Sequence, residues 1–325
     1  MGSSLEDIVQ CIRVAVTQAE PEWLDLEATV VKTCRVIAEA AQNGAQLVTF
    51  PECWIPGYPA WIWSRSVDFD MTTLYQKNSL RIDSSEMQRI CESAAQNKIA
   101  VALGFAENFH HTLFISQALI GADGDIKIQR RKLKATHMER TIFGDASGDC
   151  LRNVVDLPEV GKVGMLACWE HSQSLLKFHT YQQKEEVHVA AWPPVFPHVE
   201  GPGLWSMTRE GARNLSATYA IESQAFVLHT TAVISQKGVD KMRTSSGVVM
   251  NTPGGGSSAI FGPDGRQLSK DMLETEEGII YADLDFDAIL RAKSFLDCTG
   301  HYSRPDVLWI GVDDREKTHR RAEGS

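Results

Sequence analysis

Apolar residues recur at two different spacings along the first third of the chain. Cys11–Ala19 is a short run rich in apolar and β-branched residues, which is typical of a strand. Leu26–Asn43 places Leu, Val, Ile and Ala at helical spacing, with Asp25 positioned to cap its start and Gly44 to end it. A further strand, helix and strand are expected at Gln46–Phe50, Ser84–Asn97 and Ile99–Phe105, with Ser84 opening the helix. This alternation predicts an α/β fold in which helices cover the strands.

The middle of the chain adds hairpins to this pattern. Thr112–Ile120 and Ile126–Arg131 flank the turn-forming linker GADGD, and Ser258–Phe261 and Arg266–Leu268 flank GPDG. Further strands are expected at Lys162–Ala167, Val187–Ala191, Phe226–Ile234 and Gly278–Leu284, and helices at Ser172–Lys184 and Met207–Gln224. Parallel-type units mixed with hairpins indicate mixed sheets in layered packing rather than a pure Rossmann sheet or a TIM barrel.

Composition narrows the class of protein. The 325 residues are 43% hydrophobic and 23% charged, which excludes a disordered or fibrous chain. With 32 basic and 42 acidic residues the net charge is −10, so we expect neither a nucleic-acid nor a membrane partner. No apolar run approaches the ~20 residues that span a bilayer. The start, MGSSLEDIVQ, lacks the basic and apolar regions of a secretory signal. We therefore expect a cytoplasmic protein.

No low-complexity linker divides the chain, so we predict one domain over residues 1–312, followed by a charged, flexible tail at residues 313–325. The segment 253–258 (PGGGSS) lacks the GK[ST] ending of a phosphate loop, and no GxGxxG follows the first strand. The ten histidines form no HExxH motif or metal-ligand cluster. We expect no nucleotide cofactor and no metal.

Seven cysteines are scattered along the chain without a CxxC pair, which argues against a disulfide framework or a zinc ribbon. Cys168 follows the strand KVGMLA and precedes a helical segment. Backbone N–H groups at such a turn can lower a thiol pKa and bind a developing anion. From this segment alone, a nucleophile and a buried core cysteine remain equally open, and the other cysteines are expected to be inert.

Two charged positions are also candidates for chemistry. Glu52 ends the strand QLVTF before a loop rich in proline and aromatic residues, where partial desolvation would raise its pKa toward that of a general base. An exposed strand-end glutamate is the commoner alternative. In the run RRKLK, strand alternation places Lys132 and Lys134 on one side, so that either can point inward, with Glu139 as a counter-charge. A solvated face is the commoner reading of such a run.

These segments together resemble the nitrilase branch of the carbon–nitrogen hydrolase superfamily, most closely its fungal-type arylacetonitrilases. The resemblance spans Ile12 to Val312 and rests on FPECWIPGYPAWIW, RRKLKATHMERTIFGDASGD, ACWEHSQSLLKFHTY, VAAWPP and GHYSRPD. It implies a four-layer α-β-β-α sandwich with two mixed β-sheets, and a catalytic triad of Glu52, Lys132 and Cys168. It also implies that Glu139 orients the lysine. The residues implied to border the substrate pocket are Tyr58, Phe143, Trp169 and Trp192.

The chemistry implied is hydrolysis of an organic nitrile to a carboxylic acid and ammonia. Glu52 serves as general base, Cys168 forms a thioimidate, and Lys132 with the backbone N–H of Trp169 stabilises negative charge on the substrate. An amide by-product is possible, and no cofactor or metal is required. Members of the family form dimers and helical oligomers.

Two residues depart from the family pattern, because Ala135 and Ser174 stand where prolines are usual. Both substitutions can loosen the backbone near the lysine or the nucleophile. The alternatives are a cyanide hydratase or an aliphatic amidase of the same superfamily, or a non-catalytic scaffold member. The run CWEHSQS argues against cyanide hydratases, which usually have a run closer to WENMNP after the cysteine.

Overall fold

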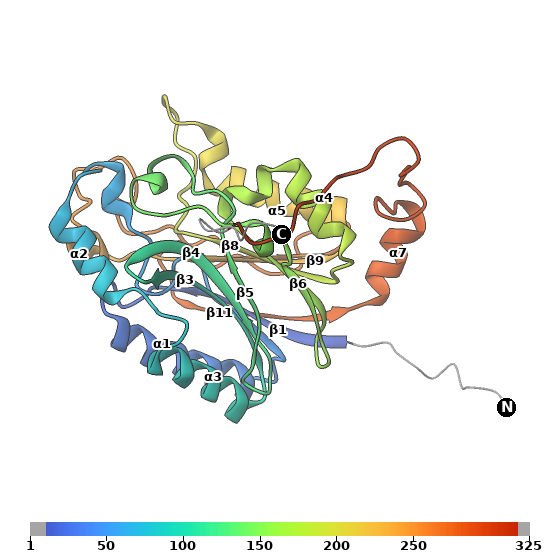
Figure 1. The fold of residues 1–325 in the computed structure, drawn as a ribbon, viewed down its shortest axis with the longest axis horizontal. Helices are drawn as coiled ribbons and strands as arrows, with labels where there is room; N and C mark the ends of the chain where they lie inside the picture. Colours follow the sequence, from blue (N-terminus) through green and yellow to red (C-terminus); the bar gives the residue numbers. More distant parts are fainter. Residues whose placement is uncertain (1–10, 318–325) are drawn as a thin grey trace, which may run out of the picture.

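A computed structural model describes residues 11–317 of the chain. The expectation about a secretory signal concerns residues 1–10, which lie outside the described residues, as do residues 318–325 of the predicted tail. The described chain forms four layers, with helices on both outer faces of a folded β-structure (Figure 1). None of the helices in the described part is long and apolar enough to cross a membrane.

One β-layer contains six strands: β1 (Cys11–Ala19), β2 (Leu47–Thr49), β3 (Ala100–Phe109), β4 (Thr112–Ile120), β5 (Ile126–Arg131) and β11 (Gly278–Asp285). The other contains β6 (Val154–Leu157), β7 (Gly161–Ala167), β8 (Val187–Trp192), β9 (Phe226–Ala232) and β10 (Ala259–Phe261). The strand order is β5-β4-β3-β2-β1-β9-β8-β7-β6, with β11 paired to β1 and β10 to β9. Gln18 and Ala19 pair with Thr231 and Ala232, so a short parallel pairing joins the two mixed layers. The predicted sandwich is confirmed, and this pairing makes its two sheets continuous.

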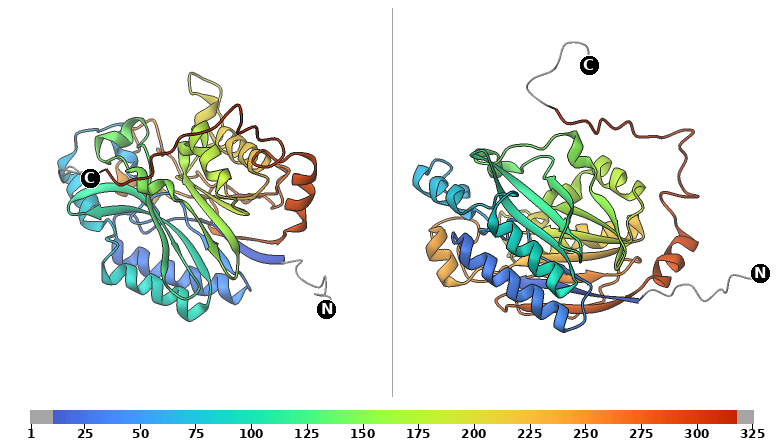
Figure 2. Two further views of the ribbon diagram at one scale, coloured as in Figure 1. Left: turned by 45° about the vertical axis from the view of Figure 1, so that its right-hand side comes forward. Right: turned by 60° about the horizontal axis from the view of Figure 1, so that its bottom comes forward.

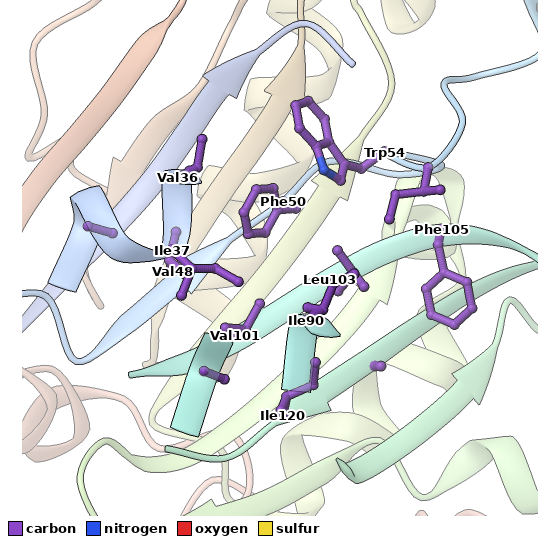
Figure 3. Close-up of a cluster of buried hydrophobic side chains, with 14 of the residues drawn as sticks. Val36, Ile37, Val48, Phe50, Trp54, Ile90, Val101, Leu103, Phe105 and Ile120 are labelled. Atoms are coloured by element: carbon purple, nitrogen blue, oxygen red, sulfur yellow. The ribbon is translucent and has the colours of Figure 1, made fainter. Parts of the chain in front are cut away.

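Alternation along the strands explains the layering. On β1, Ala15 and Ala19 face the helices α1 (Leu26–Gln42) and α3 (Ser85–Asn97), whose apolar stripes complete the cluster in Figure 3. Intervening β1 residues such as Val14 face the other way and join the core between the two β-layers. Each β-strand in this region is therefore apolar on both faces, which is why it appears as a continuous apolar run in the sequence.

The opposite outer face is covered by α4 (Ser174–Gln182) and α5 (Arg209–Ser223). Leu176 and Tyr219 on these helices pack on Leu166, Ala190 and neighbouring residues of β7–β10. Burying an aliphatic side chain in such a layer stabilises the fold by about 1.5–3 kcal/mol. This packing fixes the end of β7, from which the chain continues into Cys168.

Most predicted elements are confirmed, and the predicted caps act as expected. The side chains of Asp25 and Ser84 accept hydrogen bonds from the backbone N–H groups of Ala28 and Met87. The second hairpin is present but irregular, because residues 266–268 pair with β10 without forming a strand of their own. Phe261 bridges Gln267, and the backbone N–H groups of Gly262 and Leu268 donate to the carbonyls of Arg266 and Ile260, both at 2.8 Å. The sequence did not reveal four elements: α2 (Phe69–Asn78), α6 (Gln236–Met242), α7 (Asp287–Phe295) and β6.

These four elements share a weak pattern. Helix α2 buries only Met71 and Tyr75, and α7 only Ile289, so neither carries the broad apolar stripe that identifies a helix. Helix α6 spans seven residues and β6 spans four. Elements this short contain too few positions to establish a period.

After α7 the chain crosses the surface without regular structure and returns toward the middle of the molecule (Figure 2). Asp314 pairs with Arg152 at 2.9 Å, and the backbone N–H of Lys317 donates to the Ser147 hydroxyl. The first residues of the predicted tail, 313–317, therefore contact the body of the protein.

Candidate active site

Cys168 occupies a strained position where strand β7 ends. It is the first residue of a 3-10 turn, η4 (Cys168–Ser172), and has a φ of +50°, in the left-handed region that non-glycine residues rarely adopt. Its side chain is buried, with 3% of the residue exposed. A strained and buried cysteine at a strand end is expected where its surroundings fix the direction of its side chain.

The backbone of Cys168 is held by a chain of buried histidines. Its carbonyl oxygen accepts from His171 Nδ1 at 2.7 Å, so His171 carries its proton on that nitrogen. The other ring nitrogen of His171 lies 3.0 Å from His188 Nε2, and His188 Nδ1 lies 2.7 Å from a Glu185 oxygen. Burial is the main cause that lowers the pKa of His171 far below its usual value, with the neighbouring His188 adding to it. A neutral His171 is therefore a structural support for the turn.

Lys132 and two glutamates meet beside Cys168. The Lys132 ammonium donates to Glu52 Oε1 and to Glu139 Oε2, both at 2.9 Å, and only 1% of its side chain is exposed. Carboxylate oxygens of Glu52 and Glu139 and the Cys168 sulfur all lie within 4.8 Å of one another. A divalent metal would need these same ligands, but the lysine already supplies the positive charge that balances the carboxylates. The structure thus brings together the four residues predicted to carry the chemistry.

Glu139 is held more completely than Glu52. It lies in a second 3-10 turn, η2 (His137–Thr141), where its Oε2 accepts from the backbone N–H of Thr136 at 2.7 Å. Its Oε1 accepts from the Tyr58 hydroxyl at 3.0 Å, and that hydroxyl accepts from Trp63 Nε1 at 3.2 Å. Tyr58 was predicted to border the substrate, and its hydroxyl also fixes Glu139.

Glu52 has fewer hydrogen-bond partners than Glu139. It follows β2, is 1% exposed, and its backbone N–H donates to the Trp192 carbonyl at 3.3 Å. Its Oε2 has no hydrogen-bond partner among the described residues. Burial raises the pKa of Glu52 to about 7, although Lys132 opposes the shift. A carboxyl group with a pKa near neutrality and a free oxygen is suited to accept and return a proton.

The thiol of Cys168 does not have the lowered pKa that its backbone position suggested. Burial raises its pKa well above the usual value, and the negative charge of Glu52 adds to the effect. Lys132 and the backbone N–H of Trp169 act in the opposite direction but do not outweigh burial. The resting thiol is therefore protonated and needs a base.

A small cavity of about 70 Å³ opens beside Cys168. Tyr58, Trp169 and Trp192 line it, and Trp192 is held by stacking on His171 with ring centroids 5.5 Å apart. Phe143 is not among the lining residues and packs edge-on against Tyr75 at 6.2 Å. Trp63, from the aromatic segment after Glu52, also lines the cavity. The rest of the wall was not predicted: Thr136, Pro193, Pro194, Val195, Ser206, Met207, Ala212, Val249 and Met250. These residues come from segments far apart in the sequence, including helix α5 at Ala212, and only the fold brings them to one cavity.

Strand alternation does not extend through the basic run. Strand β5 ends at Arg131, and the chain then turns, so Lys134 faces solvent and pairs with Asp145. Lys132 and Lys134 therefore lie in different surroundings, contrary to the prediction that they share a side. Arg130 and Lys132 are the buried members of the run.

The two positions that depart from the family's prolines differ in their local bonding. The backbone N–H of Ala135 donates to Asp145 at 3.3 Å, a contact that proline cannot make. Ser174 is the first residue of α4, where proline is well tolerated.

These features define a class of protein. It has an α-β-β-α fold in which a cysteine, a lysine and two glutamates meet in a buried site near the ends of strands. The sequence profile described as carbon–nitrogen hydrolase matches residues 13–293. The chain belongs to the carbon–nitrogen hydrolase family.

Proteins named arylacetonitrilase are similar over nearly the whole chain. The one from Aspergillus niger is 65% identical, covering 95% of this chain and 94% of its own length. The one from Hypocrea virens is 61% identical over 94% and 93% of the two chains. Among solved structures, a carbon–nitrogen hydrolase from Helicobacter pylori shares the fold with a TM-score of 0.69 and 16% identity, covering 88% and 93% of the two chains. A Saccharomyces cerevisiae member of branch 10 of the nitrilase superfamily gives 0.66, with 18% identity over 92% and 99%.

Proposed function

We propose that this protein is a nitrilase that hydrolyses arylacetonitriles to carboxylic acids and ammonia. The observation that carries the proposal is the buried contact between Lys132, Glu52 and Glu139 beside Cys168, in a cavity lined by aromatic side chains. The arylacetonitrilases that share more than half of their residues with this chain support the substrate class.

The reaction begins with proton transfer from the Cys168 thiol to Glu52, whose Oε2 is free to receive it. The thiolate attacks the nitrile carbon, and the nitrile nitrogen takes up a proton to give a thioimidate. Lys132 and the Trp169 N–H stabilise the negative charge that develops on the substrate. Glu139 holds the lysine in place through its contact at 2.9 Å.

Water then adds to the thioimidate as Glu52 accepts its proton. The tetrahedral intermediate expels ammonia and leaves a thioester, and a second water molecule releases the carboxylic acid and restores the thiol. If the intermediate expels the thiolate instead, the product is an amide. The proposed steps use only side chains and backbone groups of this chain and water.

The test is ammonia release from phenylacetonitrile by the full chain. We expect turnover by the unaltered protein and none by Cys168→Ala, with the same circular-dichroism spectrum. Cys91→Ala is the matched control, because this half-buried cysteine lies on α3, on the outer face of the other β-layer. Undiminished ammonia release by Cys168→Ala would contradict the mechanism.

A substrate panel separates the alternatives. Phenylacetonitrile, benzonitrile, cyanide and phenylacetamide are compared, with acid and amide products quantified. Preference for cyanide would indicate a cyanide hydratase, and preference for phenylacetamide an amidase. A non-catalytic member would turn over none of them, and its Cys168 would be alkylated no faster than the other six thiols.

The proposal includes self-association into dimers and higher helical oligomers. Its support is an apolar segment after α7 in which Tyr302, Leu308 and Trp309 are 65%, 78% and 77% exposed. We expect Leu308→Ser/Trp309→Ser to reduce the sedimentation coefficient. An unchanged coefficient would place the contact elsewhere.

Seven free cysteines are compatible with the reducing cytoplasm, where we place the enzyme.

A further inference from the structure

Glu170 binds the chain next to both reacting side chains without touching either of them. It is fully buried, on the same 3-10 turn as Cys168. Its Oε2 accepts from the backbone N–H of Ala167, the residue before Cys168, at 2.9 Å. Its Oε1 accepts from the backbone N–H of Leu133, the residue after Lys132, at 2.7 Å. One carboxylate thus connects the neighbours of the nucleophile and the lysine.

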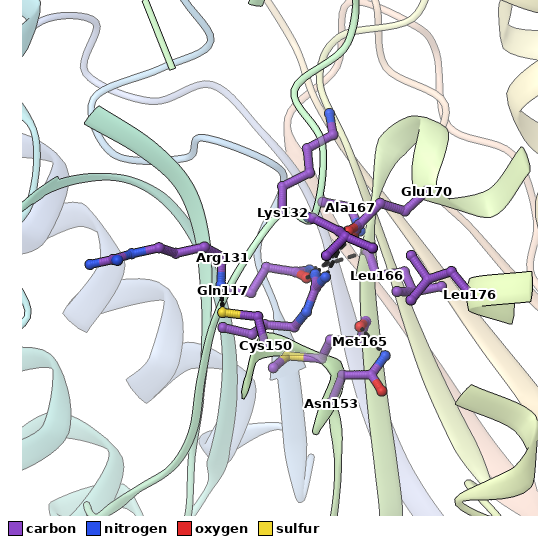
Figure 4. A network of polar contacts seen from close by, with 12 residues as sticks. Gln117, Arg131, Lys132, Cys150, Asn153, Met165, Leu166, Ala167, Glu170 and Leu176 are labelled. Atoms are coloured by element: carbon purple, nitrogen blue, oxygen red, sulfur yellow. Dashed lines mark hydrogen bonds and ion pairs between the residues drawn. The ribbon is translucent and has the colours of Figure 1, made fainter. Parts of the chain in front are cut away.

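Arg130 completes this arrangement. Its guanidinium donates to both oxygens of Glu170, at 2.9 and 2.7 Å, and to Gln117 at 2.6 Å. Gln117 in turn donates to the Leu166 carbonyl at 3.2 Å. Figure 4 shows this network between the two β-layers, with Lys132 and Arg131 leaving it in different directions. The network therefore joins β4 and β5 to the end of β7.

No strand pairing fixes this junction. Strand β5 is at one end of the strand order, whereas β7 is next to the other end. Around this network the core between the layers is apolar, and Ile128 of β5 and Met165 of β7 belong to the same buried cluster. Apolar packing is not directional, whereas charge-assisted hydrogen bonds specify both distance and angle.

The charge state of Glu170 suits this task. Burial alone would raise its pKa, but Arg130 and the backbone N–H groups of Leu133 and Ala167 outweigh that effect and lower it. Glu170 is therefore ionised across the neutral range, and its oxygens together accept four N–H groups. A carboxylate so fully bonded does not exchange protons with substrate.

We propose that Arg130 and Glu170 are positioning residues that set the placement of Lys132 relative to Cys168. The inference rests on the proposed nitrilase function. If the lysine and the sulfur move apart, charge on the substrate is stabilised less well and kcat falls. Departure of ammonia from the tetrahedral intermediate also slows, so a larger share of intermediates expels the thiolate and gives amide. The pair thus controls both the rate and the acid-to-amide ratio.

The decisive variant is Arg130→Met/Glu170→Met, which replaces the buried ion pair with apolar side chains of similar length. This replacement leaves no buried charge unpaired, and its cost in stability is that the backbone N–H groups of Leu133 and Ala167 lose their acceptor. We expect kcat for phenylacetonitrile to fall about 100-fold, as for a misplacement near 1 Å. We expect little change in KM and a larger amide fraction.

The matched control is Arg131→Met/Glu107→Met. Arg131 is next to Arg130 and forms a similar ion pair at 2.7 Å, but this pair contacts neither Leu133 nor Ala167. We expect its kcat and amide fraction to remain close to those of the unaltered enzyme. A folded Arg130/Glu170 variant with the kcat and product ratio of this control would overturn the proposal.

A second variant and a second readout keep the test decisive. If the double variant does not fold, Glu170→Gln retains the shape and loses the charge, and Arg130→Lys retains the charge and loses the paired geometry. Both should raise the amide fraction if positioning is the role, and an unchanged fraction at reduced stability would show a merely structural one. If no nitrile is hydrolysed even by the unaltered protein, the proposed function fails by itself. Slower alkylation of Cys168 in Glu170→Gln would then still support positioning, and equal rates would refute it.

Discussion

Two buried ionic clusters lie side by side in this protein and behave in opposite ways. In the first, Lys132 is shared by Glu52 and Glu139, and one Glu52 oxygen has no partner among the described residues. In the second, Arg130 and two backbone N–H groups fill the oxygens of Glu170. The pKa of Glu52 is raised to about 7, whereas that of Glu170 is lowered. An incompletely bonded carboxylate can exchange protons, and a fully bonded one can only hold its neighbours in place.

The largest expected effect comes from removing the exchangeable carboxylate. Glu52→Gln should reduce kcat by about 10³- to 10⁴-fold, the loss typical for an essential general base. Glu170→Gln should cost less, because it acts only through its neighbours. Stopped-time ammonia assays on both variants would rank them, and a greater loss for Glu170→Gln would reverse the assignment of roles.

Removing the shared cation should damage both activity and stability. Lys132→Met leaves the charges of Glu52 and Glu139 without a cation in a buried site. Removing one partner of a buried ion pair typically lowers the free energy of unfolding by about 3–5 kcal/mol. Urea unfolding monitored by tryptophan fluorescence measures this cost. Lys134→Met is the control, since its ion pair with Asp145 is about half exposed and should contribute less than about 1 kcal/mol.

The pH dependence should report the first cluster and not the second. Glu52 must be ionised to accept the thiol proton, so kcat/KM should fall below pH 7, by about tenfold for each pH unit. Glu170 has a lowered pKa and stays ionised over that range. A profile measured with phenylacetonitrile that stays flat between pH 5 and 8 would exclude a base with the pKa of Glu52, about 7.

A smaller effect is expected at the outer support of Glu139. Tyr58→Phe removes the hydroxyl that donates at 3.0 Å and leaves the ring in the cavity wall. Loss of one hydrogen bond to a charged group corresponds to about 1.5–3 kcal/mol, or roughly 10- to 100-fold in rate if the whole effect reaches the transition state. Steady-state kinetics should show a fall in kcat, and a rise in KM alone would indicate that Tyr58 serves substrate binding only.

The smallest expected effect is at Ser174, where the helix after the Cys168 turn begins. Ser174→Pro should stabilise the protein by about 0.4–1 kcal/mol, because proline restricts the unfolded chain and suits the first helical position. Thermal unfolding measures this gain. A lower Tm would show that the backbone at the start of α4 does not accept proline.

Local sequence was sufficient for features that depend on neighbouring residues. The caps at Asp25 and Ser84 and the strand that precedes Cys168 were predicted, since each is set by residues a few positions apart. Lys132 could be chosen over Lys134 only through the family resemblance, because alternation treated the two alike. Their different environments depend on the end of β5 at Arg131, which the local pattern does not mark.

The sequence by itself determined the α/β layering and, through its motifs, the set of residues that form the candidate centre. Only the tertiary structure decided how these groups behave. The pKa of Cys168 is raised rather than lowered because burial outweighs the backbone donor, and burial depends on segments far away in the chain. The four donors to Glu170 likewise come from β5, from the residues just after it and from β7, and these two strands never pair. Distances across the two layers, and therefore charge states and positions, follow from packing that no local pattern encodes.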